Sequence, residues 1–185
     1  MRLIVILFVG CLSLTSSGQT FNQEYYSESG AKFLLGPIKP DRLTQGDYGQ
    51  WYNSGFAEYQ VDQTQLTPIK TNINDYSIRL FLGTWCGDSK REVPRMLKII
   101  EDAGYSLASV EIFAVDRRRE YLKSTPGEEA AEDNIVRVPT LIFFKDGKET
   151  NRIIEKPVKS LEEDMARILQ QLPYTPHYAN MRRSD

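Results

Sequence analysis

The chain has 185 residues, of which 41% are hydrophobic and 26% charged, and its formal net charge is −2. This length and composition are typical of one globular domain that is large enough to bury a sizeable core. A net charge so close to zero gives no electrostatic reason to expect binding to nucleic acid or to an anionic membrane surface.

The N-terminus has the pattern of a secretory signal peptide. Arg2 is followed by an apolar stretch over residues 3–14 and then by small residues that end at Gly18. A short basic region, an apolar region and a small-residue end are the parts of such a peptide. The apolar stretch is short for a permanent membrane span. We therefore predict that residues 1–18 are removed and that the protein is exported, to the periplasm or beyond the cell.

Cys11 leaves two other interpretations of the N-terminus open. Phe8-Val9-Gly10-Cys11 resembles the lipobox at which bacterial lipoproteins are cleaved and lipidated, although leucine is usual where Phe8 stands. The protein would then be anchored to a membrane through Cys11; the third interpretation is an uncleaved anchor. After cleavage or lipidation, Cys11 is not available to pair with Cys86, which leaves Cys86 as the sole thiol of the folded protein.

Residues 19–75 are rich in aromatic side chains that follow no sustained periodicity. Gly36-Pro37 and Lys39-Pro40-Asp41 interrupt any long element. The segment is too aromatic for a disordered tail. We predict an extension that packs on the main domain; the alternative is a lid or binding surface beside the active site. The aromatic residues are Phe21, Tyr25, Tyr26, Phe33, Tyr48, Trp51, Tyr52, Phe56 and Tyr59.

From residue 77 onwards, strand and helix patterns alternate. Residues 78–83 and 110–115 are short apolar runs, as expected of strands that are buried on both faces. Between them, apolar residues recur at helical spacing from Val93 to Ala103, and Gly104 is placed to end this helix. Residues 117–134 are polar and predict a partly helical connection.

The last third of the chain predicts a hairpin and a closing helix. Residues 141–144 and 152–154 flank a turn over residues 145–148, in which a glycine is available for positive φ. Ser160 fits the N-cap of a helix that ends before Pro173. This order of elements predicts an α/β protein with a mixed sheet covered by helices on both faces.

Trp85-Cys86-Gly87-Asp88-Ser89 stands where the first strand meets the first helix. At this place free backbone N–H groups and the helix dipole stabilise a thiolate. The Ser89 hydroxyl can donate a hydrogen bond to that thiolate but cannot attack a disulfide. Asp88 opposes the thiolate by its negative charge, and Lys90 and Arg91 support it if they point toward the sulfur.

Residues 76–172 resemble the thioredoxin-like superfamily. Trp85-Cys86-Gly87-x-Ser89 opens the first helix, and Pro94 matches the proline that kinks this helix in the family. Val138-Pro139-Thr140, leading into the hairpin, matches the cis-proline segment. Lys90, Glu92 and Pro94 together are similar to secreted, membrane-associated bacterial members. The resemblance implies a three-layer sandwich with a mixed central sheet, preceded by the extension and followed by a tail over residues 173–185.

The resemblance also implies roles for individual residues. It assigns catalysis to Cys86 with Ser89, and substrate binding to Trp85, Gly87, Asp88, Val138 and Pro139. The bond before Pro139 is expected to be cis, with the Val138 backbone offered to an extended peptide. Two departures are evident: Ser89 stands in place of the second cysteine, and Leu80 in place of the buried acid that assists proton transfer.

These residues predict thiol–disulfide exchange through one cysteine. Cys86 would form mixed disulfides with protein or low-molecular-weight disulfides, and an external thiol would resolve them. The alternative is a non-catalytic thioredoxin-fold module that binds peptides or proteins. We expect no cofactor and no metal, because one thiol and the distant His177 do not make a zinc site. The sequence leaves the oligomeric state open.

Overall fold

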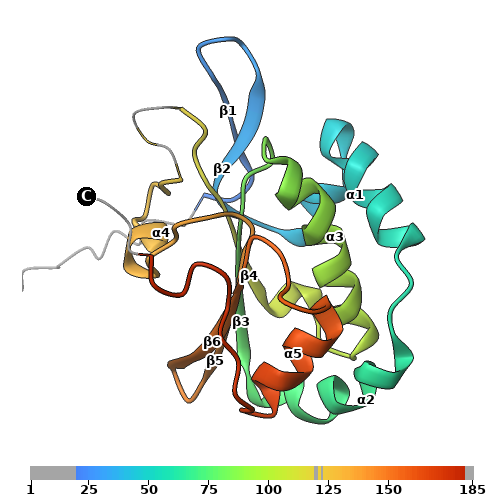
Figure 1. Cartoon of the computed structure of the whole chain (residues 1–185). Coiled ribbons are helices and arrows are strands. Elements are labelled where there is room, and N and C mark those ends of the chain that lie inside the picture. Colours follow the sequence, from blue (N-terminus) through green and yellow to red (C-terminus); the bar gives the residue numbers. More distant parts are fainter. Residues whose placement is uncertain (1–19, 119–120, 122, 182–185) are drawn as a thin grey trace, which may run out of the picture.

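A six-stranded mixed sheet forms the centre of the protein (Figure 1). The structure is a computed structural model that describes residues 20–118, 121 and 123–181. The sheet order is β1-β2-β4-β3-β5-β6. Only the β3–β4 pair is parallel, and the other four pairs are antiparallel. The strands are β1 (Gln23–Tyr26), β2 (Lys32–Ile38), β3 (Ser77–Leu82), β4 (Val110–Ala114), β5 (Thr140–Lys145) and β6 (Lys148–Ile154).

Helices lie on both sides of this sheet, but the two layers differ in thickness. Helices α1, α2, α3 and α5 lie on one side of the sheet in Figure 1, and the short helix α4 lies on the other. The predicted α/β sandwich of thioredoxin-like type is thereby confirmed, with one layer that consists mainly of loop. The helices are α1 (Gly46–Glu58), α2 (Gln63–Asn72), α3 (Gly87–Asp102), α4 (Glu129–Glu132) and α5 (Leu161–Leu169).

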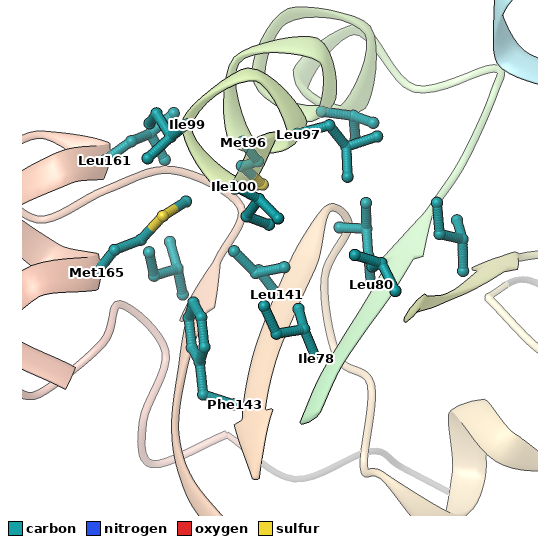
Figure 2. Close-up of a cluster of buried hydrophobic side chains, with 14 of the residues drawn as sticks. Ile78, Leu80, Met96, Leu97, Ile99, Ile100, Leu141, Phe143, Leu161 and Met165 are labelled. Atoms are coloured by element: carbon teal, nitrogen blue, oxygen red, sulfur yellow. The ribbon is translucent and has the colours of Figure 1, made fainter. Parts of the chain in front are cut away.

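The main core lies between the sheet and the four helices. Alternate residues of β3, Ile78 and Leu80, point toward α3, where Met96 and Ile100 cover them (Figure 2). All four side chains are at most 1% exposed. Burying an aliphatic side chain of this size contributes about 1.5–3 kcal/mol. This packing fixes the direction in which α3 leaves the end of β3.

The boundaries of α3 follow from its own sequence. Its apolar residues recur on one face, as the sequence predicted, and Gly104 ends the helix with φ +85°. The Tyr105 N–H donates to the Ile100 carbonyl, which closes the last turn. The helix therefore runs from the turn at Cys86 to the predicted glycine stop.

The predicted hairpin and closing helix are also confirmed. Asp146 and Gly147 both have positive φ between β5 and β6, as a two-residue hairpin turn requires. Ser160 caps α5, since its hydroxyl accepts a hydrogen bond from the Glu163 N–H at 3.1 Å. Helix α5 ends at Leu169, a few residues before Pro173.

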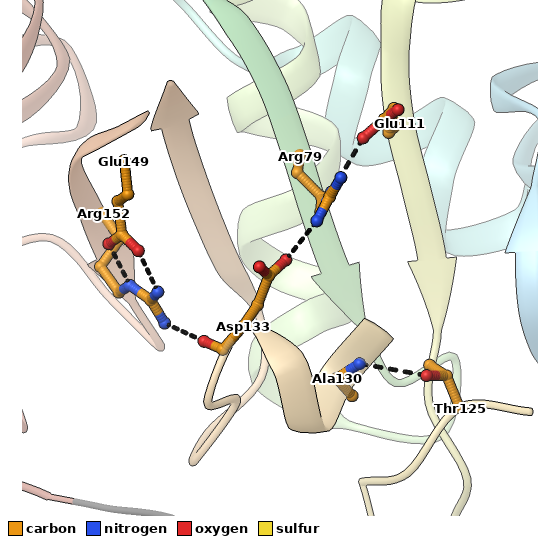
Figure 3. A network of polar contacts seen from close by, with 7 residues as sticks. All are labelled: Arg79, Glu111, Thr125, Ala130, Asp133, Glu149 and Arg152. Atoms are coloured by element: carbon orange, nitrogen blue, oxygen red, sulfur yellow. Dashed lines mark hydrogen bonds and ion pairs between the residues drawn. The ribbon is translucent and has the colours of Figure 1, made fainter. Parts of the chain in front are cut away.

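A network of charges holds the thin layer against the sheet (Figure 3). Arg79 on β3 bonds Glu111 on β4 and Asp133 just beyond α4, each at 2.8 Å. Arg152 on β6 is paired with Glu149 and donates to the Asp133 carbonyl at 2.7 Å. Three strands and the end of α4 are thus joined on this face, although α4 itself has only four residues.

Residues 20–75 form two strands, two α-helices and two short 3₁₀ helices that the sequence pattern did not predict. The Leu34 N–H on β2 donates to the Thr84 hydroxyl at 3.1 Å, just before Cys86. The buried Glu162 on α5 accepts hydrogen bonds from the Tyr59 hydroxyl and the Asp62 N–H. These contacts join the segment both to the turn at Cys86 and to the last helix.

Helix α1 also packs directly on the helix that follows Cys86. A Cβ atom added at Gly55 would lie 2.8 Å from the Pro94 ring, which is closer than such atoms approach. Glycine at this position therefore permits α1 to approach the middle of α3. The predicted signal peptide, residues 1–18, lies outside the described residues. Within the described ranges, no helix is long and apolar enough to span a membrane.

Candidate active site

Cys86 occupies the turn between β3 and α3. Its N–H donates to the Gly83 carbonyl at 2.8 Å, and its own carbonyl accepts from the Lys90 N–H at 3.0 Å. Cys86 is the N-cap residue of α3, so its side chain stands where backbone N–H groups of the first turn have no helical partner. The side chain is partly exposed and carries the one free thiol of the described residues.

The cis-proline segment lies directly against this thiol. The Val138–Pro139 peptide bond is cis, as the resemblance implied. The Cys86 thiol donates a hydrogen bond to the Val138 carbonyl, with 3.5 Å between sulfur and oxygen. Residues that are 52 positions apart in the sequence are thus brought into contact. A thiol can donate this bond and a thiolate cannot, so deprotonation frees the Val138 carbonyl to accept from another group.

Trp85 forms a wall of the same site. Its indole N–H donates to the Val115 carbonyl at 3.1 Å, which anchors the ring at the end of β4. The ring also covers the backbone of Gly83, where an added Cβ would lie 2.8 Å from it. The indole is consequently held by a hydrogen bond at one side and by close backbone contact at another.

Ser89 is fully buried, and its hydroxyl oxygen accepts a hydrogen bond from the backbone. The Gly83 N–H donates to the Ser89 Oγ at 3.1 Å. The expected bond from Ser89 to Cys86 is not among the contacts of the described residues. The Ser89 hydroxyl therefore links the first turn of α3 to Gly83, directly after β3. Its role as a hydrogen-bond acceptor is structural.

The charges that follow Cys86 are paired with one another. Arg91 donates to Asp88 at 2.8 Å and to the buried Glu92 at 2.6 Å. The hydrogen bond to Glu92, and then the one to Asp88, raise the pKa of Arg91 against the opposing effect of partial burial. The negative charge of Asp88 is thus offset by Arg91. Arg91 binds the two carboxylates and is not a partner of the sulfur. Gly87, at the first helical position, has open space beside it.

Three basic residues in the connection between β4 and β5 were not predicted as functional residues. Arg118 follows β4, and Lys123 lies further along the same connection. Arg137 immediately precedes Val138. Arg118 belongs to three consecutive arginines, which are visible in the sequence. The contact between the Lys123 side chain and the Val136 carbonyl depends instead on the path of the connection.

The described residues hold no group of three or more histidine, cysteine, aspartate or glutamate side chains able to bind a metal ion. The distant histidine, His177, lies with Nε2 3.2 Å from the Pro157 carbonyl oxygen.

Comparison with known proteins identifies a sequence relative. The chain is similar to a protein named thioredoxin from Chlamydia trachomatis serovar D, with 35% identity over 74 residues. The matched region covers 40% of this chain and 63% of that thioredoxin, which is less than two thirds of its length. No protein-family model matches the chain.

The structure was also compared with solved structures. The thioredoxin of Fasciola hepatica aligns with a TM-score of 0.37 and 24% identity, covering 55% of this chain and 88% of that one. A mutant thioredoxin of Halobacterium salinarum aligns with a TM-score of 0.36 and 22% identity, covering 62% and 89%. The class of the protein is defined by its own topology and site: a thioredoxin-like α/β fold with one cysteine at the start of α3.

Proposed function

We propose that this chain is an exported thiol–disulfide exchange protein that acts through Cys86 alone. The observation that carries the proposal is the position of the sulfur, at the start of α3 and 3.5 Å from the Val138 carbonyl beside cis-Pro139. The helix start favours the thiolate, and the cis-proline segment offers backbone groups to an extended substrate. The sequence similarity to a thioredoxin supports the same chemistry. Export rests on the leader-like pattern of residues 1–18.

The proposed reaction has two exchange steps. The Cys86 thiolate attacks one sulfur of a substrate disulfide, and the other sulfur leaves as a thiolate with the electron pair of the broken bond. A second thiolate, from the substrate, a small thiol or another protein, then attacks the mixed disulfide and releases Cys86. Ser89 has no sulfur with which to perform this second step. The reaction is therefore an exchange or isomerisation, without net reduction by this chain alone.

The test uses the full chain with Cys11→Ser, so that Cys86 is the sole thiol. The protein is incubated with oxidised glutathione at neutral pH, and intact mass is followed before and after addition of an external thiol. We expect one adduct per chain, released by the external thiol, and none in a chain that also carries Cys86→Ser. Failure to form the adduct in the folded protein, or failure to release it, would overturn the proposal.

One observation favours a non-catalytic binding module as a second candidate. The thiol is engaged with the Val138 carbonyl, so Cys86 contributes to packing in its protonated form. Under this alternative, Cys86→Ser retains the contact through its hydroxyl and leaves binding of partner proteins unchanged. A defined partner whose affinity is equal for the wild type and for Cys86→Ser would favour this candidate. Loss of that binding in the mutant would reject it.

A further inference from the structure

The described part of the C-terminal tail, residues 173–181, is attached to α5 and to the edge strand β6. Arg167 on α5 donates to the Pro173 carbonyl at 2.8 Å, and Asn151 on β6 donates to the Tyr174 carbonyl at 3.0 Å. The Tyr174 hydroxyl donates to the fully buried Asp164 at 2.9 Å. The tail therefore follows a defined path from the end of α5 along β6.

The end of the tail reaches the loop that follows β6. Nε2 of His177 lies 3.2 Å from the Pro157 carbonyl oxygen, and the Tyr178 hydroxyl donates to the Glu155 carboxylate at 2.5 Å. The tail also borders a cavity of about 440 Å³, whose lining includes Tyr178 and Met181 of the tail and the end of β6. Because the tail is not closely packed at this cavity, individual hydrogen bonds determine where it is held.

Tyr178 and Arg137 together fix the side chain of Glu155. The Arg137 guanidinium lies 5.4 Å from the centre of the Tyr178 ring, and its Nε lies 3.9 Å from the Glu155 carboxylate. The hydrogen bond to Glu155 raises the pKa of Tyr178 against the opposing charge of Arg137. The Glu155 side chain is 20% exposed. A tyrosine hydroxyl and a guanidinium thus hold one carboxylate in place.

The backbone of Glu155 contacts the segment that meets the Cys86 sulfur. Its N–H donates to the Pro139 carbonyl at 2.7 Å, and the preceding residue, Val138, accepts from the Cys86 thiol. Glu155 has φ +65°, in the left-handed region that is unfavourable for a residue other than glycine. Such a conformation persists only where the surrounding structure holds it. The hydrogen bond from Tyr178 therefore helps to maintain the backbone conformation in which Glu155 binds Pro139.

We propose that Tyr178 and Glu155 are positioning residues for the exchange reaction, which hold Val138 and Pro139 where an extended peptide meets Cys86. The inference rests on the proposed exchange function and gives the C-terminal tail a role at the same site. Neither residue touches the reacting sulfur: Tyr178 holds the Glu155 side chain, and the Glu155 backbone holds Pro139. A substrate that contacts only the sulfur should not depend on the tail, whereas one that also binds the Val138 backbone should.

The first test uses the full chain with Cys11→Ser and two disulfides that share one leaving group. Thionitrobenzoate is joined by a disulfide bond to mercaptoethanol in one and to the single cysteine of an extended peptide in the other. The Cys86 thiolate attacks the sulfur of mercaptoethanol or of the peptide, and the coloured thionitrobenzoate leaves with the electron pair of the broken bond. The ratio of the two rates cancels the intrinsic reactivity of the thiolate.

Tyr178→Phe removes only the hydroxyl and leaves the ring beside Arg137. We expect the ratio of the peptide rate to the mercaptoethanol rate to fall about threefold, which is the order of effect of one ordinary hydrogen bond. Glu155→Gln keeps an acceptor for the tyrosine and loses only a partly exposed ion pair, so its ratio should stay within about twofold of the wild type. Glu155→Ala should lower the ratio about as far as Tyr178→Phe.

The double variant tests whether the two residues act through one hydrogen bond. If they do, Tyr178→Phe combined with Glu155→Ala lowers the ratio no further than either single variant. Losses that simply add in the double variant would contradict the inference. A wild-type ratio in both single variants would overturn it.

The matched control is Tyr76→Phe. The buried Tyr76 also donates its hydroxyl to a single partner, the Leu169 carbonyl, at 2.9 Å. It directly precedes β3, whereas Cys86 follows the other end of this strand, so the variant should lose stability while its ratio stays that of the wild type. A fall in Tyr76→Phe as large as that in Tyr178→Phe would show a general loss of stability and would reject the positioning role.

A second measurement needs no exchange chemistry. The Glu155 amide is bonded to the Pro139 carbonyl, so its hydrogen–deuterium exchange reports directly how firmly this contact is held. We expect exchange of this amide to be about threefold faster in Tyr178→Phe and unchanged in Tyr76→Phe. Equal protection in the wild type and in Tyr178→Phe would contradict the inference. If neither disulfide forms an adduct with the wild type, the proposed function is rejected, and amide exchange still tests the hold of the tail.

Discussion

Replacement of Ser89 by alanine tests whether this residue is a structural acceptor or part of the chemistry. The Ser89 Oγ is fully buried and accepts the hydrogen bond of the Gly83 N–H at 3.1 Å. The Trp85 ring covers Gly83, so water has little access to replace the lost acceptor. Leaving a buried N–H group without a partner costs about 1–3 kcal/mol. The variant should unfold more readily by this amount, which corresponds to about 2–4 °C in Tm for each kcal/mol in a chain of this size.

The assay combines urea unfolding with the rate of mixed-disulfide formation at Cys86. Ser89→Ala should lower the free energy of unfolding while the adduct forms at a rate within about twofold of the wild type. Ser54→Ala is the matched control, because Ser54 is exposed on α1 and its loss should change stability by no more than about 0.5 kcal/mol. Unchanged stability together with tenfold slower formation of the adduct would refute the structural role. It would mean that Ser89 takes part in the exchange reaction.

Three further outcomes follow from packing, buried charge and titration. Gly55→Ala introduces a Cβ 2.8 Å from the Pro94 ring, and overpacking of about 1–3 kcal/mol should exceed the gain of about 1 kcal/mol in helix propensity, as urea unfolding would show. Asp164→Ala removes a fully buried acceptor of two backbone N–H groups and a tyrosine hydroxyl, so unfolding should become easier by at least about 3 kcal/mol; a loss below about 1 kcal/mol would contradict this. Burial raises the pKa of Tyr52, so the stability that it contributes is complete below its unfolded pKa of about 10 and is lost as pH rises above it. Tyr52→Phe should accordingly reduce the loss of stability between about pH 10 and 11, and an unchanged loss would contradict the assignment.

From residue 77 onwards, the sequence by itself determined the strands and helices apart from α4. The apolar runs of β3 and β4, the helical spacing of α3, the glycine stop at Gly104 and the Ser160 cap are local signals, since each depends on side chains within a few positions. The same local signals placed Cys86 at the start of a helix. The cis bond before Pro139 was a different case, because it came from the family resemblance and not from the residues themselves.

Tertiary structure alone decided how the 19–75 segment folds. Its strand β2 pairs with β4, which is distant in the sequence, and α1 depends on close approach to Pro94. Elements that are stabilised by distant partners leave little periodicity in their own sequence. The polar connection over residues 117–134 is a similar case, because α4 is only four residues long and its end is held by Arg79 and Arg152.

The surroundings of the thiol show the same division. The sequence alone named Cys86, Ser89 and the residues between them, because they are consecutive. Only the fold showed that the Ser89 hydroxyl accepts a hydrogen bond from the Gly83 N–H, and that the Cys86 thiol meets the Val138 carbonyl. Hydrogen-bond partners and local charge are set by which segments meet in space, and segments far apart in the sequence meet only when the sheet is formed.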